Sequence, residues 1–111
     1  MEKVLDKKAK AEWHNRIRYA IIKQIKEHCS KTFPSSAMAD WYIGITNNPR
    51  RRKWQHSRDR KIRKFRAWNA QTLINAHIVE QYYGMNGKGM RGGGTRGNVA
   101  SDSRYVYVFS T

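Results

Sequence analysis

Three features of the sequence have residue types and spacings that suit phosphate chemistry, and the first is a pair of side chains. Arg52 and His56 are four positions apart, so a helix would place them on one face. An arginine can hold a phosphate with two parallel hydrogen bonds, and a neutral histidine can accept or relay a proton near pH 7. The alternative is an ordinary basic helix face. Four further cations surround the pair: Arg50, Arg51, Lys53 and Arg58.

The second feature is an isolated carboxylate. Between Trp41 and Ser101 the acidic residues are Asp59, in a charged run that we expect to be solvated, and Glu80, in an apolar stretch. A partly buried carboxylate in a chain of net charge +15 needs a partner, because leaving it unpaired is costly. That partner is either an arginine or a divalent cation such as Mg²⁺, which proteins hold with one or two carboxylates. His77, one turn before Glu80 on the same face, either supports the Glu80 side chain or is a core histidine, and the core interpretation is favoured.

The third feature is Tyr42, two residues before Gly44, in a run of aromatic and β-branched residues. In a strand the two would lie on the same face, and a glycine there often marks a close approach of another group. A core tyrosine beside a bulge glycine is the simpler interpretation.

The elements that must position these residues can be predicted from local patterns. Residues 41–46 read as a strand. Asn48 is a good N-cap and Pro49 a good first helical residue, so a helix is expected through residues 50–57. Residues 104–109 read as a second strand, and residues 85–98, with six glycines in fourteen positions, as a loop.

Two further helices are expected. The first covers residues 10–28, where Trp13, Ile17, Ile21 and Ile25 recur every four positions, and residues 1–9 before it should be frayed. The second covers residues 70–83 and stops at Gly84. Its candidate buried residues are Leu73, Ile74, His77, Ile78 and Tyr82. A short helix or loop is expected around Phe65 and Trp68. Residues 30–39 should end the first helix.

These elements predict an α+β fold, with a small, mainly antiparallel sheet flanked by helices. At 111 residues the chain has room for one domain. Residues 40–111 would form its core, and the 10–28 helix would be an addition to it.

The net charge of +15 points to a polyanionic partner, because neutralising phosphates releases condensed counterions. Nucleic acid is therefore expected, and charge does not separate DNA from RNA. An anionic membrane is the weaker alternative, since no long amphipathic surface helix or spanning segment is present. A single cysteine and a charged N-terminus favour a reducing, cytoplasmic setting. Nothing indicates a homo-oligomer.

Taken together, the segment from Trp41 to His56 resembles the second half of the GIY-YIG nuclease signature. Tyr42-Ile43-Gly44 matches its Tyr-Ile/Val-Gly strand, and Arg52 follows Gly44 by eight residues, with His56 four further on. Residues 76–80, ending in Glu80, look like the segment that carries the family's metal-binding glutamate. The resemblance covers roughly residues 40–84.

The family's first motif, Gly-Ile/Val-Tyr, is missing from its usual place in residues 30–39. One interpretation is a rearranged chain, in which the last strand lies beside the Tyr42 strand and supplies the tyrosine from Tyr105 or Tyr107, with Tyr107 favoured. The other is a domain that binds DNA without cutting it.

The resemblance implies a DNA endonuclease that uses one Mg²⁺ or Mn²⁺ held by Glu80. Arg52 would bind the scissile phosphate, and Tyr42 or Tyr107, with His56, would act on the attacking water. The remaining cations would grip the DNA backbone: Arg50, Arg51, Lys53, Arg58, Arg60, Lys61, Arg63, Lys64, Lys88, Arg91 and Arg96. The last three lie in the glycine-rich loop, which could equally be an ordinary surface loop. Two other classes stay open, a non-catalytic nucleic-acid-binding module and a small protein that inhibits a nucleic-acid enzyme.

Overall fold

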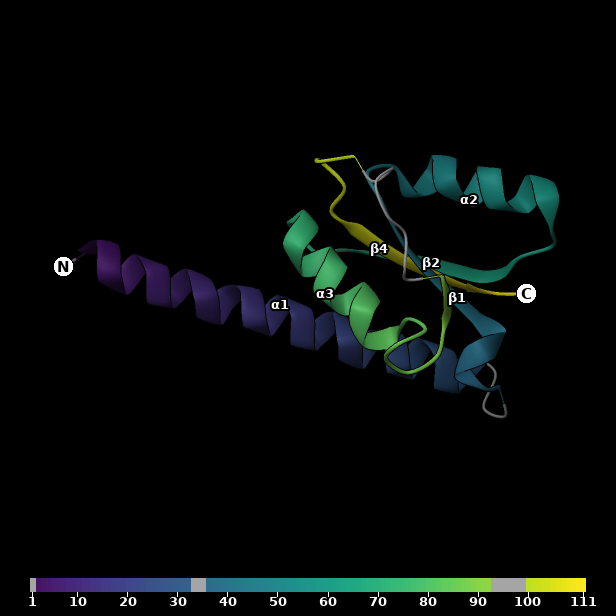
Figure 1. Cartoon of the computed structure of the whole chain (residues 1–111), viewed down its shortest axis with the longest axis horizontal. Coiled ribbons are helices and arrows are strands. Elements are labelled where there is room, and N and C mark those ends of the chain that lie inside the picture. Colours follow the sequence, from purple (N-terminus) through teal and green to yellow (C-terminus); the bar gives the residue numbers. More distant parts are fainter. Residues whose placement is uncertain (1, 33–35, 93–99) are drawn as a thin grey trace.

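The computed structural model describes residues 2–32, 36–92 and 100–111, with side chains described from residue 7. Within these ranges the fold is α+β, and a four-stranded sheet is covered by helices (Figure 1). The elements in chain order are α1 (Glu2–Thr32), the 3₁₀ turn η1 (Met38–Asp40), β1 (Trp41–Thr46), α2 (Pro49–Asp59), β2 (Arg63–Asn69), α3 (Leu73–Tyr83), β3 (Arg91–Gly92) and β4 (Tyr105–Ser110). The predicted fold class is confirmed.

The sheet has the strand order β2-β4-β1-β3. The last strand, β4, lies between β1 and β2 and is antiparallel to both, whereas the two-residue β3 is parallel to β1. Gly44 of β1 stands opposite Tyr107 of β4, and Tyr42 stands opposite Phe109. Because side chains alternate along a strand, these residues share one face of the sheet.

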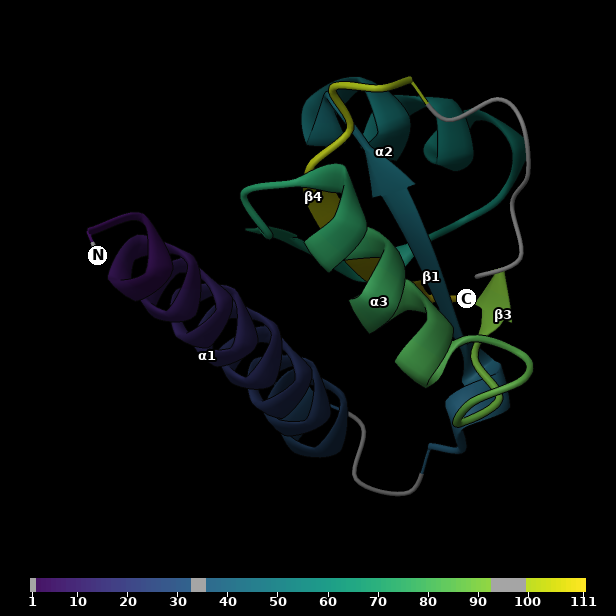
Figure 2. The same cartoon turned by 60° about the vertical axis from the view of Figure 1, so that its left-hand side comes forward.

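The two faces of the sheet are covered differently. Helix α2 lies over one face, and α1 and α3 lie over the other (Figures 1 and 2). The main hydrophobic core fills the α1–α3 side, where Trp41, Ile43, Val106 and Val108 of the sheet are all fully buried. The opposite face carries aromatic rings under α2.

Local signals account for the ends of α2 and α3. The side chain of Asn48 accepts a hydrogen bond from the Arg51 N–H, with Pro49 at the first helical position, as predicted. Thr72 caps α3 in the same way, and Gly84 follows its last residue, where the backbone N–H of Gly84 reaches the Glu80 carbonyl.

Several predicted elements were wrong. The segment around Phe65 and Trp68 is strand β2, not a short helix or loop, and the loop over residues 85–98 contains β3. Helix α1 begins at Glu2, so most of the supposedly frayed segment is helical, because Lys, Ala and Glu are good helix formers. It also runs on to Thr32, past the expected break. Trp13, expected in the packed stripe, is 49% exposed.

The buried face of α3 also differs from the prediction. Ile74, Ile78, Tyr82 and His77 are exposed, whereas Ala76, Val79, Glu80 and Tyr83 are buried. Apolar residues occur on both sides of this helix, so periodicity did not define the packed face. None of the described helices is both long and apolar enough to span a membrane.

Candidate active site

The candidate site is built around a contact between α2 and the last strand. The Nε2 atom of His56 lies 2.9 Å from the hydroxyl oxygen of Tyr107, a hydrogen-bonding distance. The imidazole also packs against Tyr42, with ring centroids 5.0 Å apart in an edge-to-face arrangement. The structure therefore brings three of the predicted catalytic residues into contact, from β1, α2 and β4.

Gly44 explains how Tyr107 reaches this position. A Cβ atom at residue 44 would overlap the hydroxyl and ring carbons of Tyr107, so the phenol ring lies directly across the glycine. The pairing of Gly44 with Tyr107 sets this register. The close approach that the strand glycine suggested is thus made by a side chain of the neighbouring strand.

An aromatic layer that sequence reasoning missed surrounds the contact. Phe65 of β2 stacks on Tyr107 at 5.3 Å, and Phe109 of β4 stacks on Tyr42 at 5.0 Å. The alternation of aromatic residues at positions 105, 107 and 109 is a signal that could have predicted one aromatic face. No signal of this kind singles out Phe65.

The surroundings keep His56 neutral and Tyr107 protonated near pH 7. Partial burial lowers the pKa of His56, and the nearby Arg60 and Arg52 cations lower it further. Burial raises the pKa of Tyr107 well above its ordinary value, because the phenol is only 3% exposed. His56 can therefore accept a proton, whereas Tyr107 keeps its own.

Arg52 lies one helical turn before His56 on the same face of α2 and is half-buried. Its positive charge lowers the pKa of His56 and opposes the rise in the pKa of Tyr107, so it lies within electrostatic range of both. Arg50 and Arg51, by contrast, are exposed.

Glu80 is buried more deeply than predicted. It is 1% exposed on the sheet-facing side of α3, and burial raises the pKa of its carboxyl to about 7. The Oε1 atom lies 3.7 Å from Nδ1 of His77, and Oε2 has no hydrogen-bond partner among the described residues. His77 is half-exposed at this contact, so its interpretation as a core histidine was wrong.

Glu80 and Arg52 do not form an ion pair within the described part of the chain. They approach the sheet from opposite faces, since α3 and α2 cover different sides (Figure 2). Both nevertheless act on Tyr107, whose pKa the Glu80 carboxylate raises and the Arg52 guanidinium lowers. Tyr107 contacts His56 directly and lies within electrostatic range of both Glu80 and Arg52.

The predicted backbone-binding cations are mostly solvent-exposed around α2 and β2. The exposed ones are Arg50, Arg51, Lys53, Arg58, Arg60, Lys61, Arg63 and Lys64. Arg58 stacks over Trp54, an exposed aromatic residue that the sequence reasoning missed although it lies four positions earlier. Lys53 lies over the ring of Phe65.

The glycine-rich loop is described only in part. Lys88 is exposed and lies over the Tyr82 ring on the α3 side. Arg91 is half-buried and donates hydrogen bonds to the Asp40 carbonyl and the Thr111 hydroxyl, so its guanidinium holds chain segments together. Arg96 lies outside the described residues.

Comparisons of the chain with protein-family models, with curated proteins and with solved structures find no significant match.

Proposed function

We propose that this protein is a divalent-metal-dependent DNA endonuclease that hydrolyses phosphodiester bonds by a GIY-YIG-type, one-metal mechanism. The observation that carries the proposal is the pairing of β4 with β1, which sets Tyr107 across Gly44 and against His56. This is the strand arrangement that a rearranged GIY-YIG chain requires. Under this proposal Tyr107 would stand in for the tyrosine of the first family motif, which is missing before the Tyr42 strand.

Each residue of the cluster has a distinct role in this proposal. Arg52 binds the non-bridging oxygens of the scissile phosphate and offsets the charge that grows on them. Neutral His56 accepts the proton of the attacking water at Nδ1, in the tautomer whose Nε2–H donates to the Tyr107 hydroxyl oxygen. Tyr42, which is only half-buried, orients that water, whereas Tyr107 is too buried to touch substrate and holds the imidazole in place.

Glu80 is the candidate ligand for a hard divalent cation. Glu80 offers a buried carboxylate oxygen without a partner, and Mg²⁺ or Mn²⁺ prefers such ligands. The described residues contain no cluster of three or more His, Cys, Asp or Glu side chains, so the further ligands would be water and phosphate oxygens. When bound, the cation would stabilise the leaving oxygen. Ionised Glu80 would hold it, and its pKa of about 7 would make that ionisation sensitive to pH near neutrality.

The exposed cations around α2 and β2 provide the grip on DNA. Side chains such as Arg50, Arg51 and Arg58 bind phosphates without reading sequence. Exposed Trp54, with Arg58 stacked on it, adds a flat surface against sugar or base. Glu80 lies on the other side of the sheet, under α3, so the proposal requires the scissile phosphate to bridge from Arg52 on the α2 side to a cation held by Glu80 near Tyr107.

The test is a plasmid nicking and cleavage assay with and without Mg²⁺. We expect Glu80→Gln and Arg52→Ala to lose cleavage by roughly 100-fold or more while they still bind DNA. Asp59→Asn and Arg51→Ala are matched controls, because they remove exposed charges of the same sign. Both should cut almost normally once the protein is in excess over the DNA, since neither side chain touches the scissile phosphate in this proposal. Equal losses in the Arg51 and Arg52 variants would show that only general cationic charge matters.

The depth of Glu80 favours one second candidate, a non-catalytic nucleic-acid-binding module. A carboxyl that is 1% exposed and makes no ion pair with Arg52 could simply stay protonated in the core. Tight, steeply salt-dependent DNA binding that never leads to cutting under any divalent metal would establish this alternative.

A further inference from the structure

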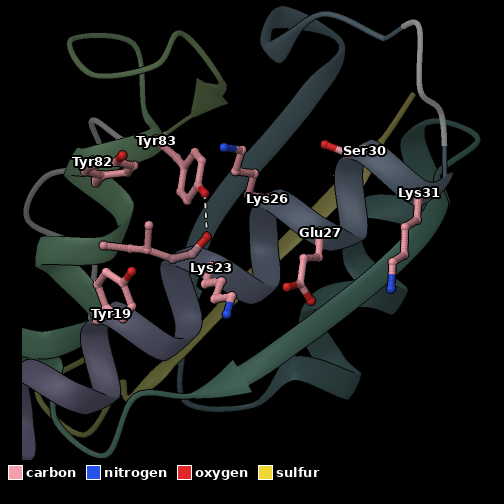
Figure 3. Close-up of a pocket in the computed structure, with 9 residues that line it drawn as sticks. Tyr19, Lys23, Lys26, Glu27, Ser30, Lys31, Tyr82 and Tyr83 are labelled. Carbon is pink, nitrogen blue, oxygen red and sulfur yellow. Dashed lines mark hydrogen bonds between the residues drawn. The ribbon is translucent and has the colours of Figure 1, made fainter.

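A groove between α1 and α3 lies on the face of the molecule opposite α2 (Figures 1 and 3). Its volume is about 590 Å³, and its lining includes Tyr19, Lys23, Lys26 and Lys31 from α1 and Tyr82 from α3. We propose that this groove binds a single strand of nucleic acid, as a second site separate from the candidate active site.

The charge of the groove favours a polyanion. Lys23, Lys26 and Lys31 line the groove from successive turns of α1, with Lys26 on the Tyr83 side and Lys23 and Lys31 on the other (Figure 3), and Lys88 lies over the Tyr82 ring. Glu27 is the acidic residue of the lining, and none of these lysines forms a salt bridge within the described part of the chain. Cations that lack protein partners are free to neutralise phosphates.

The aromatic residues favour a single strand over a duplex or an acidic peptide. Tyr19 is 71% exposed and Tyr82 43% exposed, and Figure 3 shows both rings at the same end of the groove, from two different helices. Exposed rings beside a row of cations are the combination on which unpaired bases stack. Bases inside a duplex are already stacked and cannot use them.

The two helices that form the groove are joined by a hydrogen bond, and the groove is long enough for several nucleotides. The Tyr83 hydroxyl donates a hydrogen bond to the Ile22 carbonyl at 2.5 Å and so ties α3 to α1. From Tyr19 to Lys31 a helix rises about 18 Å. At a spacing of roughly 3.4 Å per stacked nucleotide, this length accommodates about five nucleotides. A strand of that size could follow the lysines from the tyrosine end.

The proposal does not depend on cleavage, so it is tested by binding without metal. Fluorescence anisotropy of a labelled twelve-residue oligothymidine would be measured with the full chain in EDTA. We expect Tyr82→Ala to weaken binding about fivefold or more and Tyr82→Phe to bind normally, because stacking needs the ring and not the hydroxyl. Trp13→Ala, an exposed aromatic on α1 outside the groove, should change little.

A matched pair of double variants separates the groove from general positive charge. Lys23→Gln with Lys26→Gln removes two charges inside the groove, and Lys7→Gln with Lys10→Gln removes two exposed charges elsewhere on α1. A clearly larger loss for the first pair supports the site, and equal losses overturn it. Binding of oligoglutamate that depends on the lysines but not on Tyr82 would also overturn it, in favour of an acidic protein partner.

Discussion

The replacement Glu80→Gln should stabilise the fold at alkaline pH, and this prediction follows from the burial of the carboxyl. The pKa of Glu80 is about 7 in the folded protein and near 4.5 when the group is exposed. The folded state therefore binds the proton more tightly than the unfolded state. The contribution of Glu80 to the free energy of unfolding is therefore complete below pH 4.5 and is lost as the pH rises through about 7. Glutamine has a similar shape and never ionises, so it avoids that loss.

The size of the effect can be worked out from the same pKa values. Full ionisation of Glu80 costs the folded state about 3 kcal/mol, at 1.36 kcal/mol for each pH unit between the two pKa values. Glu80→Gln should therefore raise the free energy of unfolding by about 3 kcal/mol at pH 8 and by only about 1 kcal/mol at pH 5. Urea unfolding at both pH values measures this difference.

Asp59→Asn is the control, because that carboxylate is exposed and its loss should change stability little at either pH. A gain for Glu80→Gln that is equal at pH 5 and pH 8 would refute the reasoning. So would a loss of stability at pH 8, which would mean that the ionised carboxylate has a favourable partner in the fold.

Three further predictions concern the packing of Tyr107, its hydrogen bond to His56 and the ionisation of Glu80. Gly44→Ala should lower stability by about 1–3 kcal/mol in urea unfolding, because the added methyl group overlaps the Tyr107 ring, and an unchanged midpoint would contradict that packing. Tyr107→Phe should cost about 1 kcal/mol and slow cleavage without weakening DNA binding in a gel-shift assay, since it removes only the hydrogen bond to His56. Cleavage should fall as pH drops below about 7, because protonated Glu80 cannot hold a cation; a rate independent of pH between 5.5 and 8 would oppose this.

The parts of the fold that depend on neighbours in sequence could be predicted. Asn48 and Pro49 mark the start of α2, and the β-branched and aromatic residues of 41–46 mark β1. Strand β2 was missed because its alternation is interrupted, with a register shift between Arg63 and Arg66 and a positive φ of 54° at Lys64. A bulge of this kind removes the two-residue period on which strand prediction depends.

The candidate site could be predicted where it depends on local sequence patterns. Arg52 and His56 share a helix, so their spacing alone predicted a common face. The tyrosine from β4 was predicted only through the family resemblance, since strand pairing joins residues 63 positions apart, as for Gly44 and Tyr107. The full burial of Glu80 follows from how α3 packs on the sheet. It could not be predicted from the sequence, because the neighbouring residues are apolar on both faces of the helix.

Binding of Mn²⁺ to the purified protein tests the central claim most directly, because the free ion can be counted by electron paramagnetic resonance. At pH 8 we expect the wild-type chain and Asp59→Asn to remove one equivalent of Mn²⁺ from solution and Glu80→Gln to remove none. Equal uptake by all three proteins would contradict the assignment of Glu80 as the residue that holds the metal.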